Sequence, residues 1–284
     1  MKAPAPSPQA ERIFSARRAW IMGVINTTPD SFYPGARVAT VAEAVARAEK
    51  MIVDAADVID IGGESTRPGA LPVNEDEEIG RVLPVIEKLH SLWPQQLLSV
   101  DTRKASVARR ALAAGAVMIN DISAFSYDPE MPAVIADAHC WVVLMHMQGT
   151  PEYMQTSPKY IDVVGEVRAF LEERLATAVK AGVDEDKIIL DPGIGFGKTV
   201  ADNLTLLRGL RKLGAIGRPL LVGVSRKSFL GILGGRLIPA EERLEGSLAA
   251  GLWALDNGAH GLRVHDVRST RQAIEVWSAL RSNS

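Results

Sequence analysis

The chain of 284 residues contains a single cysteine, Cys140, so no disulfide can form within it. Proteins without disulfides are typical of a reducing cytosol, and we expect a cytoplasmic location. No apolar run approaches the roughly 18 residues that a membrane-spanning helix needs, so we expect no membrane insertion. The first ten residues are rich in Pro, Ala and Ser, and they lack the apolar segment of a secretory signal.

The chain also lacks an excess of either charge, since its formal net charge is −2. This balance gives no reason to expect a nucleic-acid partner, and small-molecule substrates are the simpler expectation. Neither a linker nor a shift in composition divides the sequence. We therefore predict one domain over residues 16–284, preceded by a disordered tail over residues 1–15.

Three common catalytic patterns are missing. No Ser/His/Asp triad can be recognised from order or spacing. The glycine-rich run over residues 193–199 lacks the spacing of a phosphate-binding loop, so we interpret it as a turn between a strand and a helix. His139, Cys140 and His146 do not match the spacing of a zinc site. We expect Cys140 to be a small buried hydrophobic residue.

Short runs rich in Val, Ile and Leu alternate with longer amphipathic stretches along the whole chain. Eight such runs, each followed by a helical pattern, predict an α/β fold of the (β/α)8 TIM-barrel type, with an open doubly wound sheet as the alternative. The predicted strands cover residues 20–26, 58–62, 97–101, 117–121, 141–146, 188–191, 220–225 and 262–265. The predicted helices cover residues 40–55, 74–92, 104–114, 129–138, 161–181, 201–213, 240–257 and 267–280.

Nearly every predicted strand ends in polar or glycine-rich residues. In a barrel these ends meet on one face, where barrel enzymes place their active sites. Because unpaired buried charge is costly, a purely structural barrel would not gather charged groups there. The sequence therefore predicts an active site at the carboxyl-terminal ends of the strands.

Asp101, Asn120, Asp191 and Lys227 form the first group of candidates. Carboxylates and an amide on neighbouring strand ends can recognise a planar heterocycle through hydrogen bonds in its plane. One carboxylate can accept both the ring N–H and the NH2 of an amino-pyrimidinone, and a lysine can donate to its carbonyl. Alternatively, the Asp and Asn residues cap the helices that follow them.

Arg67, Arg263 and His265 form the second group. Arg263 and His265 alternate along one strand and so point to one face, where two donors suit a phosphate. A structural ion pair between Arg263 and a barrel carboxylate such as Asp266 is the alternative. Asn26 and Asp30 offer hard oxygen ligands for Mg2+, although Asp30 also fits the first turn of a helix.

The chain resembles a known family over about residues 20–280, and nine segments carry the resemblance. They are MGVIN (22–26), TPDSF (28–32), GGESTRPG (62–69), SVDT (99–102), IND (119–121), MHMQG (145–149), DPGIGF (191–196), SRKS (225–228) and RVHD (263–266). Each segment alone is weak evidence, but all nine in this order are specific. On them the chain resembles the dihydropteroate synthases.

The resemblance implies a homodimeric barrel enzyme of folate biosynthesis and a sulfonamide target. It implies joining of 6-hydroxymethyl-7,8-dihydropterin pyrophosphate to p-aminobenzoate, with Mg2+ and release of pyrophosphate, by a dissociative, SN1-like substitution. The implied pterin site is Asp101, Asn120, Asp191, Lys227 and Arg263. The implied pyrophosphate site is Asn26, Arg67, Arg263 and His265, with Asn26 also contacting the metal. The implied p-aminobenzoate site is Thr66, Pro68, Phe196, Ser228 and Phe32. The implied catalytic residues are Lys227, Asp101, Arg263 and Asp30.

Two segments depart from the family pattern. Residues 33–36 read YPGA where the family commonly has Ser-Asp-Gly-Gly, so the loop loses a carboxylate, and catalysis must use Asp30 or do without one. Residues 55–57 read AAD where Gly-Ala-Asp is usual, so a helix-ending glycine is missing, with a small expected effect on stability.

Three other functions remain open from the sequence. A methyltetrahydrofolate methyltransferase domain would share the barrel and the pterin-reading carboxylates, but it has no use for a pyrophosphate site. A catalytically weak paralogue would bind the pterin without turnover. A phosphate-binding aldolase or isomerase barrel would use Lys227 for a Schiff base.

Overall fold

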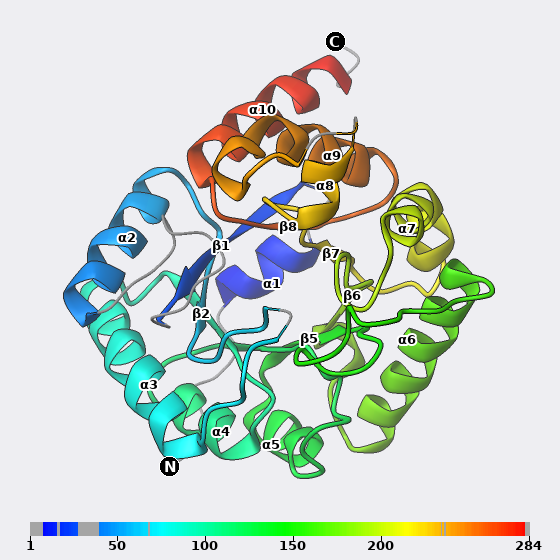
Figure 1. Cartoon of the computed structure of the whole chain (residues 1–284). Helices are drawn as coiled ribbons and strands as arrows, with labels where there is room; N and C mark the ends of the chain where they lie inside the picture. Colours follow the sequence, from blue (N-terminus) through cyan, green and yellow to red (C-terminus); the bar gives the residue numbers. More distant parts are fainter. Residues whose placement is uncertain are drawn as a thin grey trace.

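The computed structural model describes residues 8–15, 18–27, 40–67, 69–233, 235 and 237–281. Parallel strands form a ring, and helices surround it (Figure 1). The strands follow one another in the order β6-β5-β4-β3-β2-β1-β8-β7. A parallel bridge between Leu190 and Leu220 joins β6 to the segment before β7, and the Leu190 N–H donates to Pro219 O over 2.9 Å. This contact joins the two ends of the sheet, so the barrel prediction is confirmed and the open sheet is wrong.

The strands occupy the predicted apolar runs with small shifts at their ends. They are β1 Trp20–Asn26, β2 Val58–Gly62, β3 Leu97–Asp101, β4 Met118–Asp121, β5 Trp141–Met145, β6 Ile188–Asp191, β7 Leu221–Val222 and β8 Gly261–Val264. The main difference is β7, which is much shorter than the run over residues 220–225. The chain beyond it turns, and Arg226 adopts a φ of +58°.

At least one helix follows each strand, with two differences from the prediction. They are α2 Val41–Val53, α3 Glu75–Leu92, α4 Ala105–Ala113, α5 Met131–Ala138, α6 Val163–Lys180, α7 Val200–Gly214, α8 Ser228–Ile232, α9 Leu244–Asp256 and α10 Val267–Arg281. Helix α8 was not predicted, and α9 begins later than residue 240 because residues 240–242 form a separate 3-10 turn, η3 (Ala240–Glu242). None of the helices described is long and apolar enough to cross a bilayer.

Capping explains where two of the helices begin. The Thr40 side chain accepts from the Glu43 N–H, and the Glu43 side chain accepts in return from the Thr40 N–H. Both bonds satisfy groups that the first helical turn leaves unpaired. Asn74 caps α3 through the Glu77 N–H over 2.8 Å, but the Glu77 side chain pairs with Arg81 instead of returning to the cap.

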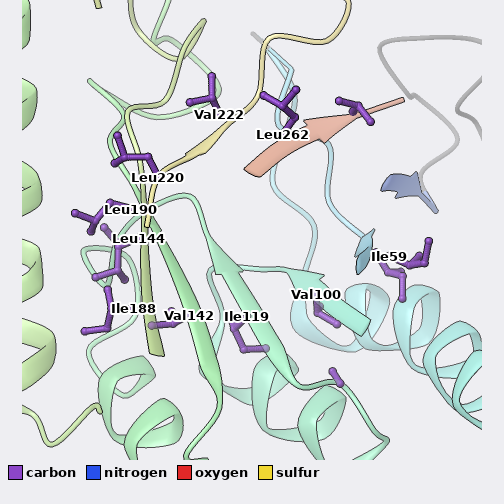
Figure 2. Packing of buried hydrophobic residues seen from close by; sticks show 14 of the residues in the cluster. Ile59, Val100, Ile119, Val142, Leu144, Ile188, Leu190, Leu220, Val222 and Leu262 are labelled. Carbon is purple, nitrogen blue, oxygen red and sulfur yellow. The ribbon is translucent and has the colours of Figure 1, made fainter. Parts of the chain in front are cut away.

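The hydrophobic core has two parts because successive strand residues point to opposite faces. Ile59, Val100, Ile119 and Val142 point outward from neighbouring strands and are covered by the helices (Figure 2). A second cluster fills the barrel interior near the strand starts. Its buried members on the strands are Trp20, Met22, Val58, Leu97, Met118, Trp141, Val143, Ile189 and Leu221. This interior layer closes the lower half of the barrel and leaves the strand ends free for polar groups.

Part of the segment predicted as a disordered tail is a helix. Helix α1 (Pro8–Ser15) lies within the ring of strands in Figure 1, and it buries Ala10, Ile13 and Phe14. The Phe14 ring lies 5.0 Å from that of Trp20 and 4.6 Å from that of Trp141. The prediction for residues 1–15 is therefore wrong for residues 8–15, while residues 1–7 lie outside the described part. The apolar residues of α1 share one face of the helix, and burying this face orders the segment despite its Pro- and Ser-rich composition.

The alanine that replaces the usual glycine after α2 adopts a left-handed conformation. Ala55 has a φ of +66°, and its carbonyl accepts from the Arg271 side chain over 2.7 Å. A residue with a Cβ pays about 1–2 kcal/mol to adopt this conformation. The turn after α2 therefore forms without glycine, at a small local cost.

Replacing Phe14 by Ala tests whether α1 is part of the folded domain. We expect the free energy of unfolding to fall by about 3–5 kcal/mol, because a buried aromatic side chain is lost and a cavity remains. The measurement is urea unfolding followed by circular dichroism. Arg12→Ala, on the exposed face of the same helix, is the control and should change stability by less than about 0.5 kcal/mol. Equal, small effects of the two substitutions would show that α1 does not close the barrel.

Candidate active site at the carboxyl ends of the strands

Strand register brings three of the predicted site residues into one layer. Asn26 lies opposite Gly62, Gly62 opposite Asp101, and Asp101 opposite Asn120. A side chain at Gly62 would begin 3.5 Å from Asn26 Oδ1 and 3.6 Å from Asp101 Cβ. Glycine at this point therefore leaves open the space between the two polar side chains.

Arg263, on β8, reaches across the barrel and is held by two carboxylates. Its Nε donates to Asp60 Oδ2 over 2.8 Å, and its Nη2 donates to Asp101 Oδ2 over 2.8 Å. The alternative of an ion pair with a barrel carboxylate is therefore confirmed, but Asp266 is not the partner, because it accepts from Nε and Nη2 of Arg226. The two carboxylates fix the plane of the Arg263 guanidinium, whose side chain stays 19% exposed to the barrel mouth.

The charges of this group shift one another's pKa values. Burial raises the pKa of Asp101 to about 7; nearby Asp60, Glu78 and Glu64 push in the same direction, and Arg263 opposes them. Burial alone would lower the pKa of Arg263, but the Asp60 and Asp101 carboxylates outweigh it, and the pKa is raised. Arg263 is therefore a permanent cation, whereas Asp101 changes charge near neutral pH.

Asp191 and Lys227 form the second charged group of the mouth. Asp191 Oδ1 accepts from the Gly193 N–H over 2.7 Å. Lys227 Nζ donates to Ile194 O and lies 4.4 Å from the centre of the Phe196 ring. Burial lowers the pKa of Lys227 to about 8, Arg263 adds to the shift, and Asp191 opposes it. Burial also raises the pKa of Asp191, against the effect of Lys227.

The glycine-rich turn after β6 places Phe196 beside Lys227. Gly193 has a φ of +65°, and a Cβ there would lie 1.8 Å from His146 O. Only glycine permits this close approach of two backbones. The interpretation of residues 193–199 as a turn between strand and helix is confirmed, since the turn connects β6 to α7.

His265 lies beside the Arg263 group but does not contribute a charge. Its Nδ1 is 3.0 Å from Ser225 Oγ, and burial, assisted by the Arg263 cation, lowers its pKa to about 3. His265 is therefore neutral at physiological pH and offers an anion a hydrogen bond rather than a charge.

Some predicted site residues are not brought into this network. Thr66 and Arg67 lie on the loop after β2, and the Arg67 guanidinium makes no hydrogen bond or ion pair to a described residue. Ser228 is exposed at the start of α8. The remaining predicted residues, Asp30, Phe32 and Pro68, lie outside the described residues, as does the altered loop at 33–36.

Two features of the site were missed by the sequence reasoning. Asp60 lies within an apolar strand, and the only signal was a single charge among Val and Ile residues. Lys198 is buried; its Nζ lies 2.9 Å from His146 Nδ1 and donates to Phe196 O over 2.9 Å. Burial lowers the pKa of Lys198 to about 7, and the nearby Lys227 cation adds to the effect. No local pattern distinguishes such a buried lysine from one exposed in a loop.

The loop after β2 is held by a buried ion network. Glu64 pairs with both Arg103 and Lys104, and Lys104 also pairs with Glu78 at the start of α3. The Glu64 carboxylate also accepts from the Val73 N–H over 3.2 Å. These contacts fix the loop that carries Thr66 and Arg67 to the segment between β3 and α4.

The comparisons with known proteins agree with this geometry. Residues 22–265 match the family model described as "Pterin binding enzyme". The chain is 44% identical to a dihydropteroate synthase of Synechocystis over 98% of this chain and 96% of that protein.

Solved structures of dihydropteroate synthases have the same fold. The Yersinia pestis enzyme in complex with a sulfonamide drug matches with a TM-score of 0.90 and 43% identity, over 94% of this chain and 95% of that one. The Xanthomonas albilineans enzyme in complex with 7,8-dihydropteroate matches with a TM-score of 0.83 and 44% identity, over 94% and 95% of the two chains. The chain therefore belongs to the dihydropteroate synthase family of pterin-binding enzymes.

Proposed function

We propose that this enzyme joins the dihydropterin to p-aminobenzoate at the mouth of its barrel by a dissociative, SN1-like substitution. The proposal rests on the convergence of side chains at the barrel mouth, four from the carboxyl-terminal parts of strands and one from the start of α8: Asp101, Asn120, Asp191, Arg263 and Lys227. The Xanthomonas relative has been solved with 7,8-dihydropteroate bound. This molecule combines a dihydropterin with p-aminobenzoate, which supports the same pair of substrates here.

The pterin is recognised through its polar edges. The Asp191 carboxylate accepts from the ring N–H and the amino group, and Lys227 donates to the ring carbonyl. Asn120 and Asp101 contact the remaining nitrogen positions from the opposite side of the mouth. The Arg263 guanidinium, held in one plane by Asp60 and Asp101, offers a flat cationic face for stacking.

The pyrophosphate lies against Arg263 and the donors around it. Arg263 keeps its positive charge at every physiological pH, His265 supplies a neutral hydrogen bond, and Arg67 has no competing partner among the described residues. Stabilising the charge that develops on the leaving oxygen lowers the barrier to breaking the C–O bond.

The chemical step separates charge and requires no strong base. The C–O bond to the methylene breaks, and its electron pair leaves with pyrophosphate. The electron-poor methylene is conjugated to the pterin ring, which donates electrons to it. The neutral arylamine of p-aminobenzoate then forms the C–N bond, and its proton passes to the released pyrophosphate or to water. Since no group must first be deprotonated, the enzyme acts by holding the reactants and stabilising charge.

The p-aminobenzoate ring is placed beside Phe196, whose position is fixed by Lys227 on one face and by the Lys198 bond to its carbonyl. Thr66, Ser228, Pro68 and Phe32 complete this pocket in the proposal. The Yersinia relative has been solved in complex with a sulfonamide drug, which supports sulfonamides as ligands of this enzyme as well.

Mg2+ is proposed as the cofactor, and the donor set fits it. Asn26 presents an amide oxygen next to the open space at Gly62, and no group of three or more His, Cys, Asp or Glu side chains among the described residues forms a closed metal site. A single protein ligand suits Mg2+, which keeps several waters and binds substrate phosphates. When bound, the ion neutralises charge on the pyrophosphate.

A homodimer in the cytoplasm is proposed as the working form. The adjacent helices α9 and α10 expose Trp253, Val276 and Leu280, which are 51%, 58% and 83% exposed. Apolar groups exposed on two helices in contact support an interaction surface on this side of the barrel. Light scattering of the native protein should give twice the mass of one chain. The Trp253→Lys variant should give a mass closer to that of a single chain. A native protein with the mass of a single chain would contradict the dimer.

Pyrophosphate release tests the reaction and its pterin-reading carboxylate. With both substrates and Mg2+, we expect turnover that requires p-aminobenzoate and is lost when the metal is chelated. Asp191→Ala should lower kcat/KM by at least about 100-fold, because charge-assisted hydrogen bonds to the pterin are lost. Glu87→Ala removes the same charge on the exposed face of α3 and should have no effect. Full activity of the Asp191 variant would refute the assigned role.

The pH dependence of kcat/KM tests Lys227. The lysine must be protonated to donate to the pterin carbonyl, and its pKa is lowered to about 8. Activity should therefore fall as pH rises through about 8. An arginine stays protonated throughout this range, so Lys227→Arg should remove the alkaline decline from whatever activity remains. An unchanged alkaline limb in the variant would mean that another group titrates there.

A further inference from the structure

Asp60 is a buried carboxylate that joins two residues of the proposed pterin site. It lies in the middle of β2 and is fully buried. Its Oδ2 accepts from Asn120 Nδ2 over 3.2 Å and from Arg263 Nε over 2.8 Å. It lies opposite Val24 and Ser99, whereas Asn120 lies opposite Asp101, two residues further along β3. Asp60 therefore approaches Asn120 and Arg263 from below, inside the barrel.

This carboxylate is a poor way to stabilise the fold. Its Oδ1 has no hydrogen-bond partner among the described residues, and the neighbouring Ser99 hydroxyl has none either. Burying a charge with half of its acceptors unused costs free energy, and an apolar residue of similar volume is often as stable or more so. A role in holding Asn120 and Arg263 accounts for a carboxylate here better than stability does.

The carboxylate decides which way the Asn120 amide faces. An ionised carboxylate only accepts hydrogen bonds, so it requires the NH2 end of the amide to point toward it. Asn120 Oδ1 must then point away from Asp60, toward the open end of the barrel. The amide is left with one acceptor and one remaining N–H donor for a ligand. A neutral residue at position 60 that both donates and accepts would permit either orientation.

We propose that Asp60 is a positioning residue that locks the Asn120 amide and the Arg263 plane, and thereby selects a 2-amino pteridine over its 2-oxo counterpart. This inference rests on the proposed function, because it requires a pteridine at the barrel mouth. Asp60 itself does not touch the substrate. It acts only through the two side chains that it holds.

The selection follows from the hydrogen-bond pattern of the ligand. A 2-amino-4-oxo pteridine presents an amino donor next to the N1 acceptor, which matches the Oδ1 acceptor and Nδ2 donor of the locked amide. The 2,4-dioxo ring presents a carbonyl acceptor next to an N1–H donor, and so requires the amide to be flipped. A locked amide leaves mismatched polar groups facing the dioxo ring, which is how binding sites reject close analogues.

The test compares the binding of two ligands to three proteins. Calorimetry measures the Kd of the 6-hydroxymethyl 2-amino-4-oxo pteridine and of its 2,4-dioxo counterpart for the wild type, Asp60→Asn and Asp60→Ser. We expect both variants to bind the amino ligand about tenfold more weakly, a loss typical of one charge-assisted hydrogen bond. The wild type should have a larger Kd for the 2,4-dioxo ligand than for the 2-amino ligand. In both variants the ratio of these two Kd values should fall by about tenfold, because the Asn120 amide becomes free to flip.

Two controls separate this role from a general loss of structure. Asp57→Asn removes another buried carboxylate, which accepts from the Ile21 N–H and Arg18 near the strand starts, and it should leave the ratio unchanged. In an Asn120→Ala background the Asp60 substitutions should not narrow the ratio further, because the amide is absent.

Each outcome has a distinct meaning. If the wild type does not bind the amino ligand, the proposed function itself fails. If the wild type binds it and the folded Asp60 variants keep the wild-type ratio, the inference is overturned. The same holds if the ratio narrows equally with and without the Asn120 amide.

Discussion

The Arg263 guanidinium, shared between the carboxylates of Asp60 and Asp101, is the interaction on which the rest of the site depends. It crosses the barrel from β8 to β2 and β3 and so ties together strands that are far apart in the sequence. Burying three charged groups is tolerated because each hydrogen bond is charge-assisted and the mouth remains partly open. The same arrangement sets the electrostatics of the mouth, since it raises the pKa of Arg263 while Asp101 keeps a pKa near neutrality.

The lower half of the barrel contributes mainly to stability, and the mouth carries the polar groups of the site. Below the mouth, α1 and the Trp-rich interior layer bury apolar surface, which supplies the driving force for folding. At the mouth itself, carboxylates, lysines and glycine-rich turns stand in place of apolar side chains. Lys198 and Glu64 are buried in loops rather than strands, and both fix segments that carry predicted substrate contacts. Polar networks thus hold the site in place, and the apolar burial in the lower half of the barrel offsets the free energy that these buried polar groups cost.

The fold was predictable from the sequence because strand and helix periodicity is a local property. Runs of Val, Ile and Leu identified all eight strands, and the amphipathic stretches between them identified most of the helices. The order of α1 was missed because it comes from contacts between elements: Phe14 packs on Trp20 of β1 and on Trp141 of β5, and periodicity within one segment does not reveal such contacts. The site candidates Asp101, Asn120, Asp191 and Arg263 were predictable since they end strands. Asp60 was not, because its role appears only when Arg263 arrives from the other end of the chain.

The most direct test of the account is a secondary deuterium isotope effect on kcat/KM with the pterin methylene dideuterated. In the proposed mechanism the protein stabilises charge separation, and the C–O bond breaks before the arylamine attacks. This mechanism predicts a large normal effect, because the methylene becomes planar and electron-poor in the transition state. An effect close to unity would mean that the nucleophile is already bonding as pyrophosphate leaves, and would contradict the dissociative mechanism.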